Sequence, residues 1–423
     1  MRDYCIMRRV VVTAALLMCA SLLVNVKARA QEVGGDISGG AGIFRPKNPE
    51  TTSKRRTSGS TTSRTRPATT RASRTTKATG LSAAEVGERV EDALEEGNEA
   101  RDARKYTEAE RSYRDVLQLK PRDWRAAYGL GNVYTDQQRW DEAEKAYRQA
   151  VEFNQNSADA YVALSYVLAQ PRTGASNAKR LADAEWAARR AILIQADNAI
   201  AHDQLGTVLE ARGLIDQSTE AAYRRAVELD PQFAVAHVHL ARLLRKMNRR
   251  NDAEPHYQRA KELARDAPTL ILIAEALQSE QRWDDSEPVL RRALEIDARN
   301  PNALFLLGRM LVVKKQFSEA EPILKSTIEI SPRSFSPYYI LGSAYLRMDR
   351  YEDAERIYNR AAEFASAGDR KLLAGAFGLS GVGDGYLKAG RPNDALRAYQ
   401  RALQLDPTNA ELQSKVADTR TRL

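Results

Sequence analysis

The chain has 423 residues, of which 43% are hydrophobic and 29% are charged, so it is long enough to form a substantial folded body. Its formal net charge of +9 is unevenly placed, because residues 1–80 carry 15 Lys/Arg and 4 Asp/Glu, while the rest of the chain carries 50 and 52. A near-neutral body with a basic N-terminal region argues against nucleic acid binding. Both cysteines, Cys5 and Cys19, lie near the N-terminus, so removal of that region leaves no thiol for disulfides, catalysis or metal binding.

Residues 1–30 have the three parts of a secretory signal peptide. Basic residues precede an apolar run over 10–26, and the small-x-small triplet at 28–30 precedes Gln31. An apolar run of this length is at the lower limit for crossing a bilayer, so an uncleaved anchor stays open as an alternative. Lipid attachment at Cys19 is a third alternative. Each of them exports the chain, and we expect it in the periplasm or cell envelope, cleaved or anchored.

Residues 31–80 predict a disordered linker that is first Gly-rich and then rich in Ser, Thr and Arg. Such a composition buries almost nothing, so ordering it costs backbone entropy without apolar gain. The basic residues over 45–80 would suit an anionic envelope polymer or a membrane surface, the alternative being a solvated spacer. The stretch 39–50 is less repetitive, and it offers a second possibility, a short docking segment.

Ordered structure is expected from about residue 81, where Ser82 and Glu85 match a capping box. The stretch 124–156 then shows the unit from which the folded part is built. Its apolar residues form two stripes at helical spacing, which predict two short helices joined by a tight turn. Asp141 is expected to cap the second helix at its start. Gly131 lies inside the first helix, where glycine costs about 0.5–1 kcal/mol relative to alanine, and this predicts close approach of the second helix.

The small residue at the place of Gly131 returns about every 34 residues, which means that one helical hairpin is copied end to end. The series is Gly97, Gly131, Ser165, Gly206, Ala241, Ala274, Gly308, Gly342 and Gly383. Two gaps of 41 residues mark insertions near 171–179 and 366–371, which we expect to be surface loops.

Further marks accompany the small residue within each unit, such as Ala143, Tyr147 and Ala150 after Gly131. With these marks in register over about residues 90–407, the chain resembles the tetratricopeptide repeat (TPR) family. The resemblance implies an all-α fold, a right-handed superhelical solenoid of about nine TPR hairpins over 81–407, with first helices along its concave wall. Residues 408–423 are expected to form a C-terminal capping helix, started by Thr408 or Asn409.

The chain offers little support for catalysis, a metal or a cofactor. His237 and His239 are two residues apart on an expected helix and face different sides, which is poor geometry for one metal. The glycine-rich stretch 381–385 lacks the preceding strand and the following Lys-Ser/Thr of a phosphate loop. No nucleophile, base and orienting partner stand at a defined spacing. We therefore expect no enzyme activity and no cofactor.

The concave wall is the better candidate site. Carried over from the family, the residues facing it include Asn98, Asn132, Arg242, Arg245, Lys246, Phe305, Arg309, Tyr339 and Arg347. The two asparagines match part of the clamp with which some family members hold a C-terminal carboxylate, but Leu94 stands where that clamp has lysine. The basic residues suit an acidic peptide. The alternative is an ion-pair ladder, because Glu275 comes one repeat after Arg242 and one before Arg309.

These features predict an exported protein–protein interaction scaffold that binds an extended peptide or a partner subunit on its concave surface. An accessory of a cell-envelope assembly or secretion complex would have these properties. The alternative function is an envelope-polymer or membrane-surface tether that acts through the basic linker, with the solenoid as spacer. No nucleic acid partner is expected.

Overall fold

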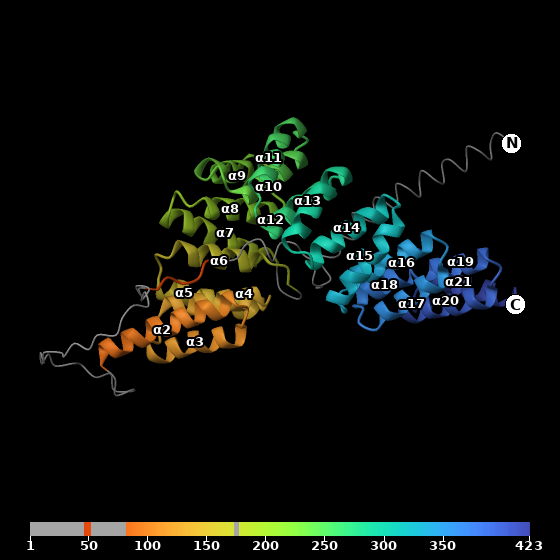
Figure 1. The fold of residues 1–423 in the computed structure, drawn as a ribbon, viewed down its shortest axis with the longest axis horizontal. Coiled ribbons are helices and arrows are strands. Elements are labelled where there is room, and N and C mark those ends of the chain that lie inside the picture. Colours follow the sequence, from red (N-terminus) through yellow and green to blue (C-terminus); the bar gives the residue numbers. More distant parts are fainter. Residues whose placement is uncertain (1–45, 52–81, 173–176) are drawn as a thin grey trace, which may run out of the picture. The chain divides into compact units, whose positions relative to one another are not determined.

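The computed structural model describes residues 46–51, 82–172 and 177–423, and in these ranges the regular elements are α-helices (Figure 1). The helices are α2 (Ala83–Asp102), α3 (Tyr106–Leu119), α4 (Trp124–Asp136), α5 (Trp140–Phe153), α6 (Ala158–Ala169), α7 (Asn177–Ile194), α8 (Ala199–Ala211), α9 (Gln217–Leu229), α10 (Ala234–Lys246), α11 (Arg250–Leu263), α12 (Ala267–Ser279), α13 (Trp283–Ile296), α14 (Pro301–Val313), α15 (Phe317–Ile330), α16 (Phe335–Arg347), α17 (Tyr351–Ala362), α18 (Ala367–Ala374), α19 (Leu379–Lys388), α20 (Pro392–Leu405) and α21 (Ala410–Arg420). Among the described helices, none combines the length and the apolar character that crossing a membrane requires. The signal peptide predicted at 1–30 and most of the linker predicted at 31–80 lie outside the described residues.

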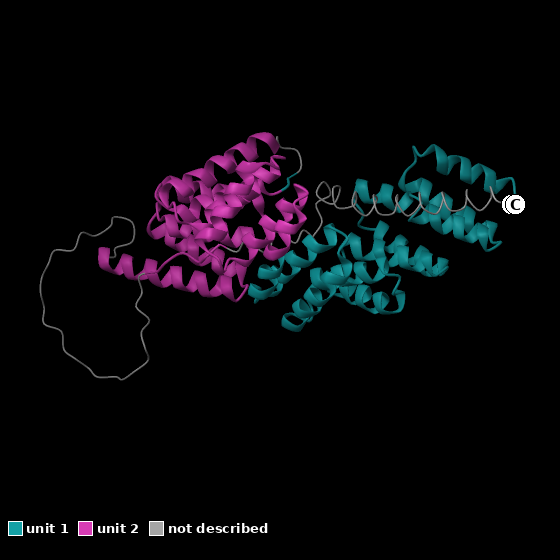
Figure 2. Cartoon of the chain, turned by 90° about the horizontal axis from the view of Figure 1, so that it is seen from above, with its two compact units in different colours: residues 1–40, 171–174, 257–423 teal, residues 41–170, 175–256 magenta. Residues whose placement is uncertain are grey.

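The described residues form two compact units, with the boundary inside α11 (Figure 2). The N-terminal unit comprises 46–51, 82–170 and 177–256, and the C-terminal unit comprises 257–423 with 171–172. In each unit successive helices pair as hairpins, such as α2 with α3, α4 with α5, α12 with α13 and α14 with α15. The second helix of a hairpin also packs on the first helix of the next one, as α3 does on α4. This stacking confirms an all-α solenoid of helix hairpins.

Where the small residue of the first helix is a glycine, it lies under a tyrosine or leucine side chain of the second helix. A Cβ added to Gly131 would lie 2.5 Å from Cδ1 of Tyr147, a separation that real Cβ atoms do not show. Tyr147 is fully buried there. Leu324 has the same relation to Gly308, at 2.7 Å. The close approach that the glycine spacing predicted is therefore confirmed.

Apart from the α6–α7 connection, part of which lies outside the described residues, the turn inside each hairpin contains one residue with positive φ, such as Arg104 at 59° and Gln138 at 58°. Gly213 and Gly390 have this place in two other repeats, with φ of 83° and 71°. The left-handed conformation ends the first helix and lets the chain reverse within a few residues before the second helix begins.

The second helix of the unit starts earlier than its acidic residue predicted. α5 begins at Trp140, and its N-cap, Arg139, makes no side-chain cap hydrogen bond. Asp141 lies inside the first turn instead, where its negative charge interacts favourably with the positive end of the helix dipole. The cap predicted at Asp141 is therefore wrong. The capping box of Ser82 and Glu85 is confirmed, with both reciprocal bonds present.

The insertions and the C-terminus show how local residues start extra helices. The expected surface loop at 366–371 is wrong, because Ser366 and Asp369 form a capping box that starts α18, and Leu373 of this helix is fully buried. Residues 173–176 of the other insertion lie outside the described residues. Asn409 caps α21 by accepting from the Leu412 N–H, so the capping helix is confirmed.

Candidate peptide-binding site

A short segment of the chain, residues 46–51, lies against α2 and α4 in the N-terminal unit (red in Figure 1). Four of its main-chain carbonyls accept hydrogen bonds from side chains of these two helices. The pairs are Arg101 Nη1 to Pro46 O at 2.7 Å, Asn132 Nδ2 to Lys47 O at 2.8 Å, Asn98 Nδ2 to Pro49 O at 3.0 Å and Arg125 Nη1 to Glu50 O at 3.2 Å. We call the surface formed by Asn98, Arg101, Arg125 and Asn132 the amide–guanidinium surface. It holds an extended polypeptide by its backbone.

A tyrosine of the following helix orients each asparagine. The hydroxyl of Tyr147 donates to Asn132 Oδ1 at 2.8 Å, and that of Tyr113 donates to Asn98 Oδ1 at 2.8 Å. With its oxygen engaged in this way, each amide turns its Nδ2 donor toward the segment. Thr135 Oγ1 lies 3.1 Å from the Tyr147 hydroxyl. Since the Tyr147 hydroxyl donates its hydrogen to Asn132, we infer that Thr135 is the donor in this contact.

Arg101 anchors the centre of the surface. Its guanidinium forms a bidentate ion pair with Asp136, with Nε to Oδ2 at 2.8 Å and Nη2 to Oδ1 at 3.0 Å. Burial works against the charge of Arg101, but the hydrogen bonds and the charge of Asp136 outweigh it, so the pKa of Arg101 is raised. Its Nη1 remains directed at the segment, where it also reaches Asn48 Oδ1 at 2.9 Å. Arg125 is held in the same manner by Glu91, with Nη2 to Oε1 at 2.8 Å.

The side chains of the segment divide into buried and exposed ones. Pro46 and Pro49 are buried against the N-terminal unit, while Lys47 and Glu50 are exposed. Asn48 is half-buried and donates from Nδ2 to Asp102 Oδ2 at 2.8 Å. Residues 46–51 thus depart from the disordered linker expected over 31–80. Every carbonyl named above finds a donor, which offsets the entropy lost on ordering.

The last repeat carries the same arrangement with a different occupant. Asp384 follows Gly383 as Asn132 follows Gly131, and it accepts from the Tyr399 hydroxyl at 2.6 Å. Lys415 of the capping helix α21 reaches both Asp384 oxygens at 3.0 Å. In this repeat the capping helix therefore engages the position that holds the segment in the first two repeats.

The basic residues predicted on α10 are engaged with an acidic residue of the preceding repeat. Arg242 Nη2 lies 2.9 Å from Glu210 Oε2, and Lys246 Nζ lies 2.6 Å from Glu210 Oε1. Burial alone would raise the pKa of Glu210, but these two charges lower it to about 2. Arg245, half-buried on the same helix, has interactions of its own. The N-terminal unit thus contains an ion-pair cluster on α8 and α10.

The other predicted residues belong to the C-terminal unit. Arg309 donates from Nη2 to Gln278 Oε1 at 2.5 Å and stands over the ring of Phe305, with 5.8 Å from guanidinium carbon to ring centroid. Burial lowers the pKa of Arg309, and Glu275 partly offsets this effect. That coupling is one half of the ladder proposed as an alternative. Tyr339 stacks on Phe335 at 5.7 Å between ring centroids, and Arg347 is exposed at the end of α16.

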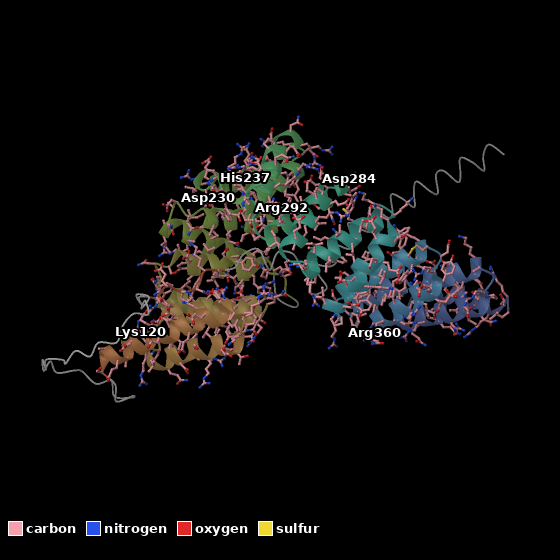
Figure 3. All side chains as sticks on the ribbon, in the orientation of Figure 1. Lys120, Asp230, His237, Asp284, Arg292 and Arg360 are labelled. Atoms are coloured by element: carbon pink, nitrogen blue, oxygen red, sulfur yellow. The ribbon has the colours of Figure 1, made fainter. Side chains whose placement is uncertain are left out.

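Two histidines meet in the N-terminal unit although they are 19 residues apart in sequence. His237 Nδ1 on α10 lies 3.0 Å from His256 Nδ1 on α11, and His237 Nε2 faces the Pro231 carbonyl at 3.2 Å (Figure 3 labels His237). His239 faces away and contacts Asp203 at 2.9 Å. The described residues contain no cluster of three His, Cys, Asp or Glu side chains suited to a metal ion.

The sequence reasoning found the two asparagines but missed their companions. Arg101, Arg125, Tyr113 and Tyr147 were not among the expected site residues. One signal was available for the tyrosines, because each follows its asparagine by 15 residues and both sit 34 residues apart. The sequence pointed to residues 46–51 only weakly, through the less repetitive composition of 39–50.

Family models match several parts of the chain. Models described as tetratricopeptide repeat match residues 94–161, 236–270 and 334–408, and one described as anaphase-promoting complex, cyclosome, subunit 3 matches residues 279–361. No curated protein matches the chain.

Solved structures of similar fold include yeast Tom70, with a TM-score of 0.56 and 15% identity over 93% of this chain and 75% of that one. YrrB, described as a TPR protein with an unusual peptide-binding site, has a TM-score of 0.34 and 20% identity over 42% of this chain and 91% of its own. MamA has a TM-score of 0.34 and 23% identity over 40% and 93%. At 15% identity the likeness to Tom70 shows the fold alone. The matched models, the period of the small residues and the stacked hairpins together show that this chain is a tetratricopeptide repeat protein.

Proposed function

We propose that this protein is an interaction scaffold that binds an extended peptide or a partner subunit along the face of its first helices. One observation carries the proposal: Asn98 and Asn132, at the same place in two successive repeats, donate to carbonyls two residues apart in an extended segment. Main-chain hydrogen bonds supply affinity in such a mode, and pockets for alternate side chains supply specificity.

The proposed mechanism is binding, with no bond made or broken. The groups that hydrogen-bond residues 46–51 are amides, guanidinium groups and one carboxylate, and they act as donors, acceptors and charges. Two discrete amides fix the register of the bound chain, and two guanidinium groups strengthen its hold because charged donors form the stronger hydrogen bonds.

We further propose that the scaffold works outside the cytoplasm, as an accessory of an assembly in the cell envelope. The support is the sequence of residues 1–30, with basic residues, an apolar run and a small-x-small triplet. N-terminal sequencing of the protein from the envelope tests this, and a mature chain starting at Gln31 is expected. A chain that retains Met1 and stays in the cytoplasm would contradict it. Binding of an envelope polymer or a membrane surface through residues 45–80 stays a prediction.

Site-specific photo-crosslinking in cells tests the scaffold function. Asp159 on α6 and Asn302 on α14 have the repeat position of Arg125 on α4, so a photo-crosslinking residue at either should capture the partner. Glu152 on α5 and Glu295 on α13, exposed on second helices, are the matched controls. The same polypeptide captured from Asp159 or Asn302, and from neither control, is the expected result. Capture from the controls alone, or from no position, would exclude the first-helix face as the working surface.

A further inference from the structure

We propose that residues 46–51 are an intramolecular ligand of the amide–guanidinium surface. From this it follows that the surface takes an extended peptide with an asparagine between two prolines, and that a partner must displace residues 46–51 to bind there. The inference rests on the proposed function and names the class of peptide that the first two repeats recognise. The surface concerned belongs wholly to the N-terminal unit.

The hydrogen bonds identify the segment as a ligand. A surface that presents amide and guanidinium donors needs acceptors, and the four bonded carbonyls of residues 46–51 supply them. Prolines at the two buried places add a further match, because proline has no N–H that burial would leave unsatisfied. Pro46 and Pro49 are three residues apart, the spacing at which residues of a polyproline-type helix share one side.

Asn48 gives the surface its sequence preference. Its side chain is read from both sides, because Oδ1 accepts from Arg101 Nη1 at 2.9 Å while Nδ2 donates to Asp102 Oδ2 at 2.8 Å. Aspartate would bring a second acceptor toward Asp102, and leucine would remove one acceptor for Arg101 and one donor to Asp102. Lys47 and Glu50 are exposed, so their side chains carry little of the recognition.

The covalent connection sets the strength of the competition. Thirty residues separate Thr51 from Ser82, the N-cap of α2. A tethered ligand acts at an effective concentration on the order of millimolar, so a peptide that binds the open surface with a Kd of about 100 µM meets roughly a tenfold reduction in the closed protein. A partner therefore needs additional contacts, and the other repeats supply the area for them.

The test uses the full chain in two forms, the wild type and a variant in which residues 46–51 are replaced by Gly-Ser repeats. The probe is a fluorescein-labelled peptide Pro-Lys-Asn-Pro-Glu-Thr with blocked ends, and binding is followed by fluorescence anisotropy. The variant should bind the peptide about tenfold more tightly than the wild type. Adding Asn98→Ala and Asn132→Ala to the variant should remove most of this binding. Hydrogen exchange of α4 and α5 verifies that the variants are folded.

Peptide variants test the proposed specificity. Alanine in place of the asparagine should weaken binding to the open surface, whereas alanine in place of the lysine should leave it unchanged. Equal affinity of the two protein forms, or no binding to either at millimolar peptide, would overturn the inference. In that case, partner capture from Asp159 and Asn302 would still support the scaffold function, because both positions lie outside the surface tested here. Loss of that capture with peptide binding intact would overturn the scaffold function alone.

Discussion

Tyr147 lies over Gly131, and its hydroxyl donates to Asn132, the neighbour of that glycine, at 2.8 Å. One side chain thus fills the space that the glycine leaves and also orients the amide that holds residues 46–51. Tyr113 has the same relation to Gly97 and Asn98. Packing within a hairpin and recognition on its surface are consequently coupled through the tyrosine.

Gly131→Ala should destabilise the second repeat. The added Cβ would lie 2.5 Å from the Tyr147 ring, and overpacking of this kind costs about 1–3 kcal/mol. Higher helix propensity offsets about 1 kcal/mol of this cost, so we expect a net loss of stability of up to about 2 kcal/mol. Because solenoid repeats open separately, native-state hydrogen exchange of α4 and α5 is the measurement.

Gly87→Ala is the matched control. Gly87 also lies inside a helix, α2, but a Cβ there meets no atom within 4 Å. Relief of the glycine penalty should stabilise α2 by about 0.5–1 kcal/mol. Equal effects of the two substitutions would show that the tyrosine contact does not explain the glycine at 131.

Tyr147→Phe should weaken the hold on residues 46–51 while keeping the ring in place. The change removes the donor to Asn132 Oδ1 and the acceptor for Thr135, both at buried positions. Unsatisfied buried groups cost about 1–3 kcal/mol, and the freed amide can also turn its nitrogen away from Lys47 O. Peptide anisotropy on the chain with residues 46–51 replaced would detect this as weaker binding. The same affinity as with Tyr147 present would show that Asn132 needs no orienting partner.

The sequence alone predicts the helical repeat, but it does not predict that residues 46–51 bind to the first two repeats. Gly131 and its counterparts recur at a fixed period, and only close helix packing explains a small residue there, so the hairpins and their contacts follow from local rules. Asn98 and Asn132 were found through their family positions. Residues 46–51 contact helices about 50–85 residues away in sequence, and no local pattern encodes such a pairing. The contact of His237 with His256 joins the two helices of one hairpin, and the spacing of histidines along a single helix does not reveal it.

The pair of histidines should make the hairpin of α10 and α11 sensitive to acid. Burial first, and then the nearby His237 and Arg224, lower the pKa of His256, with Asp252 acting in the opposite direction. A lowered folded-state pKa means that the unfolded chain binds the proton more readily, so stability is full above about pH 6.5 and falls as pH drops toward the folded-state pKa. Hydrogen exchange of α10 should be faster at pH 5 than at pH 7.5 after correction for the intrinsic rate.

His256→Asn separates this effect from general acid destabilisation. Asparagine can present a neutral N–H donor near the place of the His256 Nδ1, so the contact with His237 can persist without a titrating ring. The pH dependence of α10 protection should flatten in this variant, while α4 serves as the internal control. An unchanged pH dependence would assign the acid sensitivity to groups other than His256.

Arg101→Lys should weaken peptide binding to the amide–guanidinium surface, although the positive charge is conserved. The guanidinium makes two hydrogen bonds to Asp136, and its Nη1 also donates to Pro46 O and Asn48 Oδ1. A lysine ammonium is a compact charge that cannot reproduce this planar fork. Hydrogen bonds to charged groups contribute about 1.5–3 kcal/mol each, so loss of one or two predicts at least a tenfold weaker peptide affinity on the chain with residues 46–51 replaced. Arg111→Lys, on the exposed face of α3, is the control and should leave the affinity unchanged. If Arg101→Lys binds the peptide as tightly as the parent, the charge alone holds the backbone and the fork geometry is dispensable.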